Sequence, residues 1–369
     1  MRARACCWDV AMIEAEHEFN RASVKLENHE GKSTVAILAQ TVKHSMSMSS
    51  PSMAWLSSRA LILGICFSFV TGGAALQAQS AVLVVDAFNK KVHVAADAQS
   101  KRPVGGIAKI ATAMVTLDWA EASKVGVGVL ATVPAYAFQI SDPGSIGLQP
   151  GDQATLRDLI YATMMSSDNI AAITLGDFVG KDHLARLGRA GHPMEEFVRQ
   201  MNQLAKREGS RATHFTNPHG LENSRPLPYS TAADIARLSI YAVSRPALRF
   251  YTNQTSRNIT IYRAGQQISV ALTNTNRLLG VDRIDGVKTG NTARSGGCVV
   301  ISAEKPSSVQ VQADNTSLIY RHRMVVVVLG SASPFEEART LLYQGWAAYD
   351  RWVAAGRPIT DKRQMLDHF

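Results

Sequence analysis

Three short segments of the chain carry the residue types of an acyl-transfer site. Lys288-Thr289-Gly290 lies in a strand-like stretch, and Ser167-Asp168-Asn169 lies where a helix is expected to begin. The third segment, Gly106-Ile107-Ala108-Lys109, places a lysine three residues after a position where this chemistry needs a serine. A lysine one helical turn from a serine can take the hydroxyl proton once burial has lowered the lysine pKa. Glycine has no hydroxyl, so the sequence predicts the binding elements of such a site without its attacking oxygen.

The other two segments predict how a substrate would be held. The hydroxyl of Ser167 and the amide of Asn169 suit proton transfer and substrate binding. Lys288 and Thr289 offer a cation and a hydroxyl for a terminal carboxylate, and the strand that carries them offers an open edge for a peptide. These residue types therefore favour a peptide with a free carboxyl end as the ligand.

Each segment also has a purely structural interpretation. Ser167-Asp168-Asn169 could be a helix cap, because all three residue types favour that position. Lys109 could run along an apolar core helix with only its amine near water. Lys288-Thr289-Gly290 is a common tripeptide, and Gly105-Gly106 could be a flexible entry to a helix. The functional interpretation depends on the three segments occurring together.

Residue periodicity predicts the elements that position these segments. Strands are expected at 81–86, 91–95, 259–262, 267–270, 286–289, 298–301 and 324–330. Helices are expected at 107–119, 156–165, 170–178, 195–208, 231–243 and 335–352. Strands at both ends with helices between them predict an α+β domain whose sheet joins the N-terminal and C-terminal segments. Helix 107–119 is apolar nearly all round, so we expect it to be buried in the core.

The first part of the chain has the pattern of a secretory signal. Arg59 precedes an uncharged apolar run at 60–70, and small residues follow up to Ala78. We expect export with cleavage near Ala78, and an uncleaved membrane anchor is the alternative. The chain then divides into an extension at 1–52, a signal peptide at 53–78, a domain at 79–355 and a tail at 356–369. The extension is either the product of a start codon assigned too far upstream or a disordered segment.

Composition narrows the function classes. The 369 residues carry a formal net charge of +9, which suits an anionic polymer, a membrane surface or simply water. No compact Lys/Arg run with interleaved aromatic residues indicates a nucleic-acid partner. Of the four cysteines only Cys298 lies beyond the signal, so no internal disulfide is expected after cleavage. No Cys/His spacing suits zinc, and we expect neither a metal nor a cofactor.

Between residues 81 and 352 the chain resembles the serine-type D-Ala-D-Ala carboxypeptidases, the low-molecular-mass penicillin-binding proteins. Further segments support the resemblance in order and spacing: 101–104, 147–152, 215–221, 229–232 and 285–292. The resemblance implies a β-lactamase/transpeptidase-like α+β fold, with an antiparallel sheet packed against a helical cluster and the site between them. It also implies export to the periplasm or cell envelope, and peptidoglycan stem peptides ending in D-Ala-D-Ala as substrate.

Carried over by position, the resemblance assigns roles to eight residues. The catalytic set is Lys109 as general base, Ser167 and Asn169 as the second motif, and Lys288. The substrate-binding set is Gly106, Thr289, Gly290 and Asn291, with the backbone N–H groups of Gly106 and Asn291 forming an oxyanion hole. The departure is Gly106, where the family has its nucleophilic serine, and no Ser, Thr or Cys occurs between residues 101 and 111. Loss of such a nucleophile lowers the rate by about a millionfold.

Three functions fit these expectations. The first is a non-catalytic binder of cell-wall peptides that holds β-lactams only weakly or non-covalently, with a catalytically active paralogue as the partner that it would regulate. The second is an active hydrolase with another nucleophile, for which Ser167 is the candidate. The third is a different ligand or a water-assisted reaction on the same fold. A class A β-lactamase is disfavoured, because it needs the same serine and the chain has no Glu-x-x-Leu-Asn run.

Overall fold

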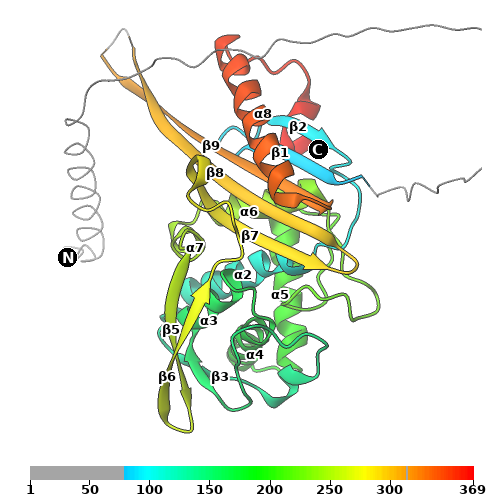
Figure 1. Cartoon of the computed structure of the whole chain (residues 1–369), viewed down its shortest axis with the longest axis vertical. Coiled ribbons are helices and arrows are strands. Elements are labelled where there is room, and N and C mark those ends of the chain that lie inside the picture. Colours follow the sequence, from blue (N-terminus) through cyan, green and yellow to red (C-terminus); the bar gives the residue numbers. More distant parts are fainter. Residues whose placement is uncertain (1–78, 313–314) are drawn as a thin grey trace, which may run out of the picture. The chain divides into compact units, whose positions relative to one another are not determined.

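A five-stranded antiparallel sheet joins the two ends of the part of the chain that the structure describes, residues 79–312 and 315–369 of a computed structural model. Its strand order is β2-β1-β9-β8-β7 (Figure 1). The strands are β1 (Ala81–Asp86), β2 (Val92–Ala96), β7 (Ile284–Thr292), β8 (Gly296–Val311) and β9 (Ser317–Ser331). The predicted joining of N-terminal and C-terminal strands is confirmed. The predicted extension and signal peptide lie outside the described residues.

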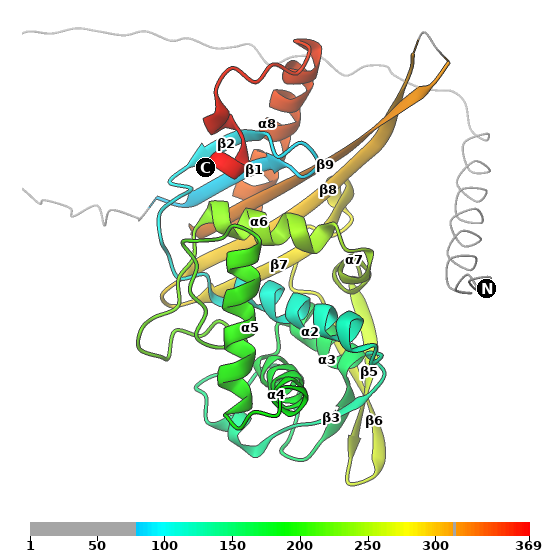
Figure 2. The same ribbon diagram turned by 180° about the vertical axis from the view of Figure 1, so that it is seen from behind.

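The central strands are rich in valine because both faces of the sheet are covered. Val84 pairs with Val326, and these side chains pack under helix α8 (Pro334–Ala354). Their neighbours Val85 and Val325 face the opposite way, into the larger core beneath helix α6 (Ala232–Val243). Figure 2 shows α6 and the other helices on that second face. A strand buried on both sides reads as a continuous apolar run, which is the pattern of β9.

In the described part of the chain, the helical cluster also contains η1 (Gly105–Ala108), α2 (Lys109–Ser123), α3 (Leu156–Met164), α4 (Asn169–Arg186), α5 (Pro193–Arg207) and α7 (Pro246–Thr252). Helix α2 is buried on almost every side, as its composition predicts. Side chains of Thr155, Asp168 and Thr231 accept hydrogen bonds at the starts of α3, α4 and α6, which satisfies backbone N–H groups there. The α+β class, with an antiparallel sheet against a helical cluster, is therefore confirmed.

A second sheet was not predicted. Its order is β3-β4-β5-β6, with strands β3 (Leu130–Thr132), β4 (Gln153–Thr155), β5 (Ser256–Arg263) and β6 (Gln266–Thr273). The hairpin of β5 and β6 is the one expected near 259–270. Strands β3 and β4 have three residues each, which is too short for an alternating pattern to stand out.

Two boundaries also differ from expectation. The helix expected to begin at 107 is preceded by the 3-10 turn η1, whose first residue Gly105 has a φ of 51°. The tail at 356–369 packs on the domain through 3-10 turns η4 (Lys362–Gln364) and η5 (Leu366–His368). Leu366 is 1% exposed, and Arg237 donates to its carbonyl at 2.7 Å. Two further 3-10 turns are η2 (Ala135–Phe138) and η3 (Val281–Arg283).

No helix within 79–312 and 315–369 combines the length and apolar character needed to cross a membrane.

Candidate active site

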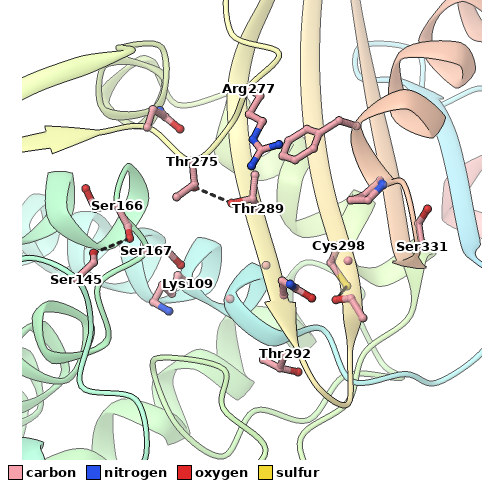
Figure 3. A pocket seen from close by; sticks show the side chains of 18 of the residues that line it. Lys109, Ser145, Ser166, Ser167, Thr275, Arg277, Thr289, Thr292, Cys298 and Ser331 are labelled. Carbon is pink, nitrogen blue, oxygen red and sulfur yellow. Dashed lines mark hydrogen bonds between the residues drawn. The ribbon is translucent and has the colours of Figure 1, made fainter.

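A cleft of about 1280 Å³ lies between strand β7 and the helical cluster. Its walls come from the starts of α2, α4 and α8, from β7, and from loops 142–145 and 273–277. Figure 3 shows Lys109 and Ser167 on the helical side and Thr289 on the strand side. Seven of the eight predicted site residues line this cleft: Gly106, Lys109, Ser167, Asn169, Thr289, Gly290 and Asn291.

Lys109 is the first residue of α2 and is only 2% exposed. Its Nζ donates to Asn169 Oδ1 at 2.6 Å and to the His219 carbonyl at 2.9 Å. Burial lowers the pKa of Lys109 to about 8, against the opposing pull of Asp168 and Asp142. Near physiological pH this amine is therefore still mostly protonated, and only a minor fraction is neutral and able to accept a proton.

The Ser167-Asp168-Asn169 segment is both a helix cap and part of the cleft. Asp168 caps α4 by accepting from the Ala171 N–H at 2.8 Å, so the capping interpretation is confirmed. Its other oxygen accepts from the N–H groups of Ser145 and Ile146, which fixes one wall of the cleft. Burial raises the pKa of Asp168, although these backbone donors and Lys109 oppose the shift.

Asn169, the first residue of α4, links the loop that contains Asp142 to Lys109 at the start of α2. Its Nδ2 donates to the Asp142 carbonyl at 2.8 Å, while its Oδ1 accepts from Lys109. The amide is therefore oriented by both bonds, with its nitrogen toward the loop and its oxygen toward the lysine. This arrangement makes Asn169 a fixed partner of Lys109.

Lys288 is the one predicted site residue that does not line the cleft. It is 1% exposed, and its Nζ donates to the Thr289 carbonyl at 2.9 Å. Burial lowers the pKa of Lys288 well below its ordinary value, and the charge of Lys109 lowers it further. Thr289 presents its hydroxyl outward, 2.7 Å from the hydroxyl of Thr275 (Figure 3).

Two glycines bring β7 and η1 into close contact at the floor of the cleft. A Cβ on Gly290 would lie 2.8 Å from the Gly106 nitrogen, so this position excludes any larger residue. A Cβ on Gly106 would instead meet Ser167 Oγ and the Thr289 carbonyl, each at 3.1 Å. The missing side chain of residue 106 therefore points at Ser167, between the strand and the helical side.

Several lining residues were missed from the sequence. His219 lies in the segment 215–221 that supports the resemblance but was given no role at the site. Its carbonyl accepts a hydrogen bond from Lys109, and burial with the nearby Lys109 charge lowers the pKa of its ring to about 3. Asp142, Thr275 and Arg277 also line the cleft. The only available signal was the polar run at 274–277 between two strand patterns.

Within residues 79–312 and 315–369, no three His, Cys, Asp or Glu side chains come together in a way that could hold a metal ion.

The family model described as D-alanyl-D-alanine carboxypeptidase matches residues 69–313. The chain belongs to this family. D-alanyl-D-alanine carboxypeptidase DacC of Escherichia coli is 28% identical over 312 residues, covering 79% of this chain and 70% of that protein. The Bacillus subtilis carboxypeptidase DacF is 26% identical over 267 residues, covering 72% of this chain but only 60% of its own length.

Solved structures place this family member among the DD-transpeptidases by fold. The Streptomyces K15 DD-transpeptidase matches with a TM-score of 0.60 at 22% identity, over 72% of this chain and 96% of that one. Penicillin-binding protein D2 from Listeria monocytogenes, solved in a cefotaxime-bound form, matches with a TM-score of 0.56 at 25% identity, again over 72% and 96%. The β-lactamase/transpeptidase-like fold expected from the sequence is confirmed.

Proposed function

We propose that this chain binds peptidoglycan stem peptides ending in D-Ala-D-Ala and does not form the acyl-enzyme of its family. One observation carries the proposal. Gly106 stands three residues before Lys109, inside a cleft that still contains Lys109, Ser167, Asn169 and Thr289. On this proposal β-lactams bind only weakly and without covalent attachment.

The chemistry follows from what the cleft retains and lacks. A peptide carbonyl beside Gly106 would meet a lysine with a pKa of about 8, an ordered amide and a strand edge. These groups can orient a peptide and accept a proton, but none of them replaces the missing hydroxyl at position 106. Binding therefore persists while the rate falls by about a millionfold relative to a complete site.

Gly106→Ser is the decisive test. The φ angle of Gly106 is outside the left-handed region, and the added Cβ needs Ser167 Oγ and the Thr289 carbonyl to shift by a few tenths of an ångström. We expect no mass increase when the wild type is incubated with penicillin, and one penicilloyl group on the variant. A covalent adduct on the wild-type chain would overturn the proposal.

Gly105→Ser provides the matched control. Gly105 has a φ of 51°, and a Cβ there would lie 2.9 Å from Ser295 Oγ. A serine one residue away from the functional position should therefore strain the turn and yield no adduct. Acylation of both serine variants alike would indicate a reaction that does not depend on the geometry of the cleft.

A second candidate is an active hydrolase in which Ser167 attacks. The Ser167 Oγ lies 3.1 Å from the position that a Cβ on residue 106 would take, and it makes no hydrogen bond to another described residue. In this reaction Ser167 Oγ bonds to the peptide carbonyl carbon, its proton passes to neutral Lys109, and the C–N bond breaks as that proton reaches the leaving amine. A water molecule then attacks the ester carbon, the bond to Ser167 Oγ breaks, and a proton of the water returns to Ser167 Oγ while the shortened peptide leaves as an acid. Turnover of a D-Ala-D-Ala peptide that survives in Ser167→Ala would exclude this candidate.

The proposal includes export to the periplasm or cell envelope, with the signal-like segment at 53–78 either removed or kept as an anchor. It also includes regulation of a catalytically active paralogue that shares the peptide ligand. Fractionation of producing cells tests the first part, and a purely cytosolic chain that retains residues 53–78 would contradict it. The effect of the purified chain on turnover by an active carboxypeptidase tests the second, and no change would contradict it.

A further inference from the structure

The hairpin of β8 and β9 continues beyond the rest of the five-stranded sheet. The pairing of β8 with β7 ends at Ala303, and the pairing of β9 with β1 begins at Met324. Residues 304–311 and 317–322 therefore form a two-stranded arm, with no other strand beside it in the described part of the chain. Figures 1 and 2 both show the two strands running on together beyond β1 and β7. Such an arm leaves the backbone groups along its outer edges to water or to another chain.

The arm also carries much of the exposed apolar surface. Of the ten large hydrophobic side chains that are exposed among the described residues, four belong to it: Val309, Val311, Leu318 and Ile319. Val309 pairs with Ile319 across the two strands, so these side chains share one face, where they are 61% and 67% exposed. Between residues 306 and 320 the sequence has one charged residue, Asp314. The arm thus has little of the charge that normally keeps an exposed strand from pairing.

The base of the arm is held to the domain on both faces. His322 is hydrogen-bonded to the Ser308 hydroxyl at 2.9 Å and to the Tyr349 hydroxyl of α8 at 2.6 Å. The next residue toward the tip, Arg321, faces the other way, and its guanidinium lies 4.7 Å from the centre of the Phe88 ring. These contacts fix the direction in which the arm leaves the sheet, which lowers the ordering cost of binding a partner.

The two outer edges of the arm are not equally open. The β8 edge contains Pro306, which has no N–H to donate, and its register with β9 shifts between Lys305 and Ser308. A proline, a register shift and a lysine are features that protect an edge from pairing. The β9 edge has none of the three from 317 to 320. The β9 edge is therefore the one to which a further strand can be added.

We propose that the β9 edge of the arm pairs with the same edge of a second copy of this chain, antiparallel, with Ile319 of one copy opposite Ile319 of the other. A two-fold axis perpendicular to the arm gives this arrangement. In this register Val309 and Ile319 of both copies form one row of four β-branched side chains across four strands. Arg321 of each copy lies opposite Ser317 of the other, so the two like charges stay apart. The inference does not depend on the proposed function, because no residue of the arm lines the cleft.

The chemistry of the edge favours a second copy over other partners. An edge with little charge offers no attraction to an acidic or a basic protein, whereas the same edge on another copy supplies matching N–H and C=O groups and an equally apolar row. A lipid surface would leave those backbone groups without hydrogen-bond partners. Contacts that bury less than about 1,200 Å² belong to weak complexes. Two short edges make a contact of this kind, and we expect a Kd of about 10 μM.

Sedimentation velocity of the full-length chain, from about 1 to about 100 μM, tests the pairing. We expect the wild type to change from monomer to dimer over this range. Ile319→Lys and Ile319→Glu should each raise the Kd by at least about tenfold, because like charges then face each other across the axis. An equimolar mixture of the two variants should dimerise again, because opposite charges then face each other. This rescue would not follow if the substitutions merely damaged the fold.

Ile359→Lys is the matched control. Ile359 is an isoleucine of the tail, 44% exposed and outside the arm. The substitution adds the same charge at a similarly exposed position, so this variant should dimerise like the wild type. Loss of the dimer in Ile359→Lys would show a general effect of added charge and would overturn the proposal.

The other contrary outcomes are equally distinct. A wild type that stays monomeric at about 100 μM overturns the proposal, also if it then binds vesicles of anionic phospholipid. A dimer that persists in Ile319→Lys overturns it too, because the chains then associate through another surface, such as the apolar run at 60–70. A mixture of Ile319→Lys and Ile319→Glu that stays monomeric excludes the pairing of Ile319 with its own copy.

Discussion

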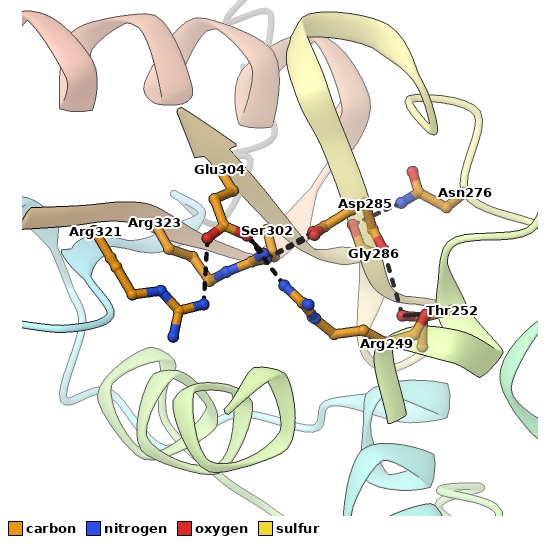
Figure 4. A network of polar contacts seen from close by, with 9 residues as sticks. All are labelled: Arg249, Thr252, Asn276, Asp285, Gly286, Ser302, Glu304, Arg321 and Arg323. Carbon is orange, nitrogen blue, oxygen red and sulfur yellow. Dashed lines mark hydrogen bonds and ion pairs between the residues drawn. The ribbon is translucent and has the colours of Figure 1, made fainter. Parts of the chain in front are cut away.

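Strand β7 carries buried charge at two places three residues apart, around Asp285 and around Lys288, and the two places are built differently. At the first, Arg323 is 2% exposed and donates to both oxygens of Asp285 at 2.8 and 2.9 Å. Arg323 also binds Glu304 and Ser302, and Glu304 in turn pairs with Arg249 at 3.0 Å (Figure 4). Opposite charges are therefore matched throughout this network.

The second place contains like charges. Lys288 and Lys109 are both almost fully buried. Burial lowers the pKa of each amine because it disfavours the charged form. Their hydrogen-bond partners are neutral oxygens of Asn169, His219 and Thr289. The carboxylate of Asp168 acts on Lys109 only through space, since its own oxygens accept backbone N–H groups.

The difference separates two uses of buried charge. In the Arg323 network, the pKa of Glu304 is lowered because the charges and hydrogen bonds of the arginines outweigh the effect of burial. Such an arrangement stabilises the ionised forms and holds the strand in place. At Lys109 burial prevails, so the amine approaches the proton affinity that a base needs. Strand β7 thus contributes Asp285 to a network of opposite charges and Lys288 to a pair of buried amines whose other member, Lys109, begins helix α2.

The largest expected effect comes from breaking the matched network. Arg323→Met removes the shared donor and leaves the carboxylates of Asp285 and Glu304 close together without it. Loss of one partner from a buried ion network costs about 3–5 kcal/mol of unfolding free energy. Urea unfolding of the wild type and the variant measures this loss.

Arg321→Met is the matched control for that measurement. Arg321 also pairs with Glu304, at 3.5 Å, but its side chain is 56% exposed. Exposed pairs contribute about 0–1 kcal/mol, so this variant should unfold almost like the wild type. If both variants lost the same free energy of unfolding, the burial of Arg323 would not be what makes its ion pairs stabilising.

Next in size is the pH dependence that Lys109 imposes. In the folded chain its pKa is about 8, and its ordinary value is 10.5. Below about pH 8 the lysine is protonated in both states, and the folded state bears the full cost of a buried charge. As the pH rises toward 10.5 the folded lysine loses its proton first, so the wild type should gain about 3 kcal/mol relative to Lys109→Met. Urea unfolding of both proteins from pH 7 to pH 10.5 follows the difference.

Only the change of that difference with pH is diagnostic. Lys109→Met also removes hydrogen bonds to Asn169 and the His219 carbonyl, which shifts stability by a constant amount at all pH values where those partners stay neutral. A difference that stays flat between pH 8 and 10.5 would mean that Lys109 has an ordinary pKa. A difference that falls with rising pH would mean that a nearby carboxylate dominates over burial.

The sequence predicts the pair of Lys109 and Lys288 better than it predicts the ion network around Arg323. The Lys109 and Asn169 positions follow from motif spacing, because a lysine at the start of one buried helix and an amide at the start of another are fixed by local structure. The valine run of β9 likewise predicts a central strand. Arg323 carried no such signal, since its partners come from β7 and β8 and meet it only through strand register.

The sequence also could not predict in which direction the Lys288 side chain points. The motif at 288–290 predicts a strand at the site, but it does not say that the Lys288 amine turns toward the Thr289 carbonyl rather than into the cleft. Arg277 was missed for the opposite reason. It belongs to no motif, and its place depends on the hydrogen bonds that hold Thr275 and Asn276 along β7.

The smallest expected effect tests whether Asp168 is charged beside the lysine pair. Burial raises the pKa of Asp168, while its ionised form raises the pKa of Lys109. If Asp168 is ionised at neutral pH, Asp168→Asn should lower the pKa of Lys109 below about 8, by less than about one unit. Titration of the lysine side chains by NMR measures the shift, and Asp158→Asn, at a partly buried position in the first turn of α3, should leave it unchanged. An unchanged pKa of Lys109 in Asp168→Asn would mean that the carboxyl is already protonated. The backbone N–H groups of Ser145, Ile146 and Ala171 would then bind a neutral acid, and burial opposed by Asp142 would set the proton affinity of the lysine.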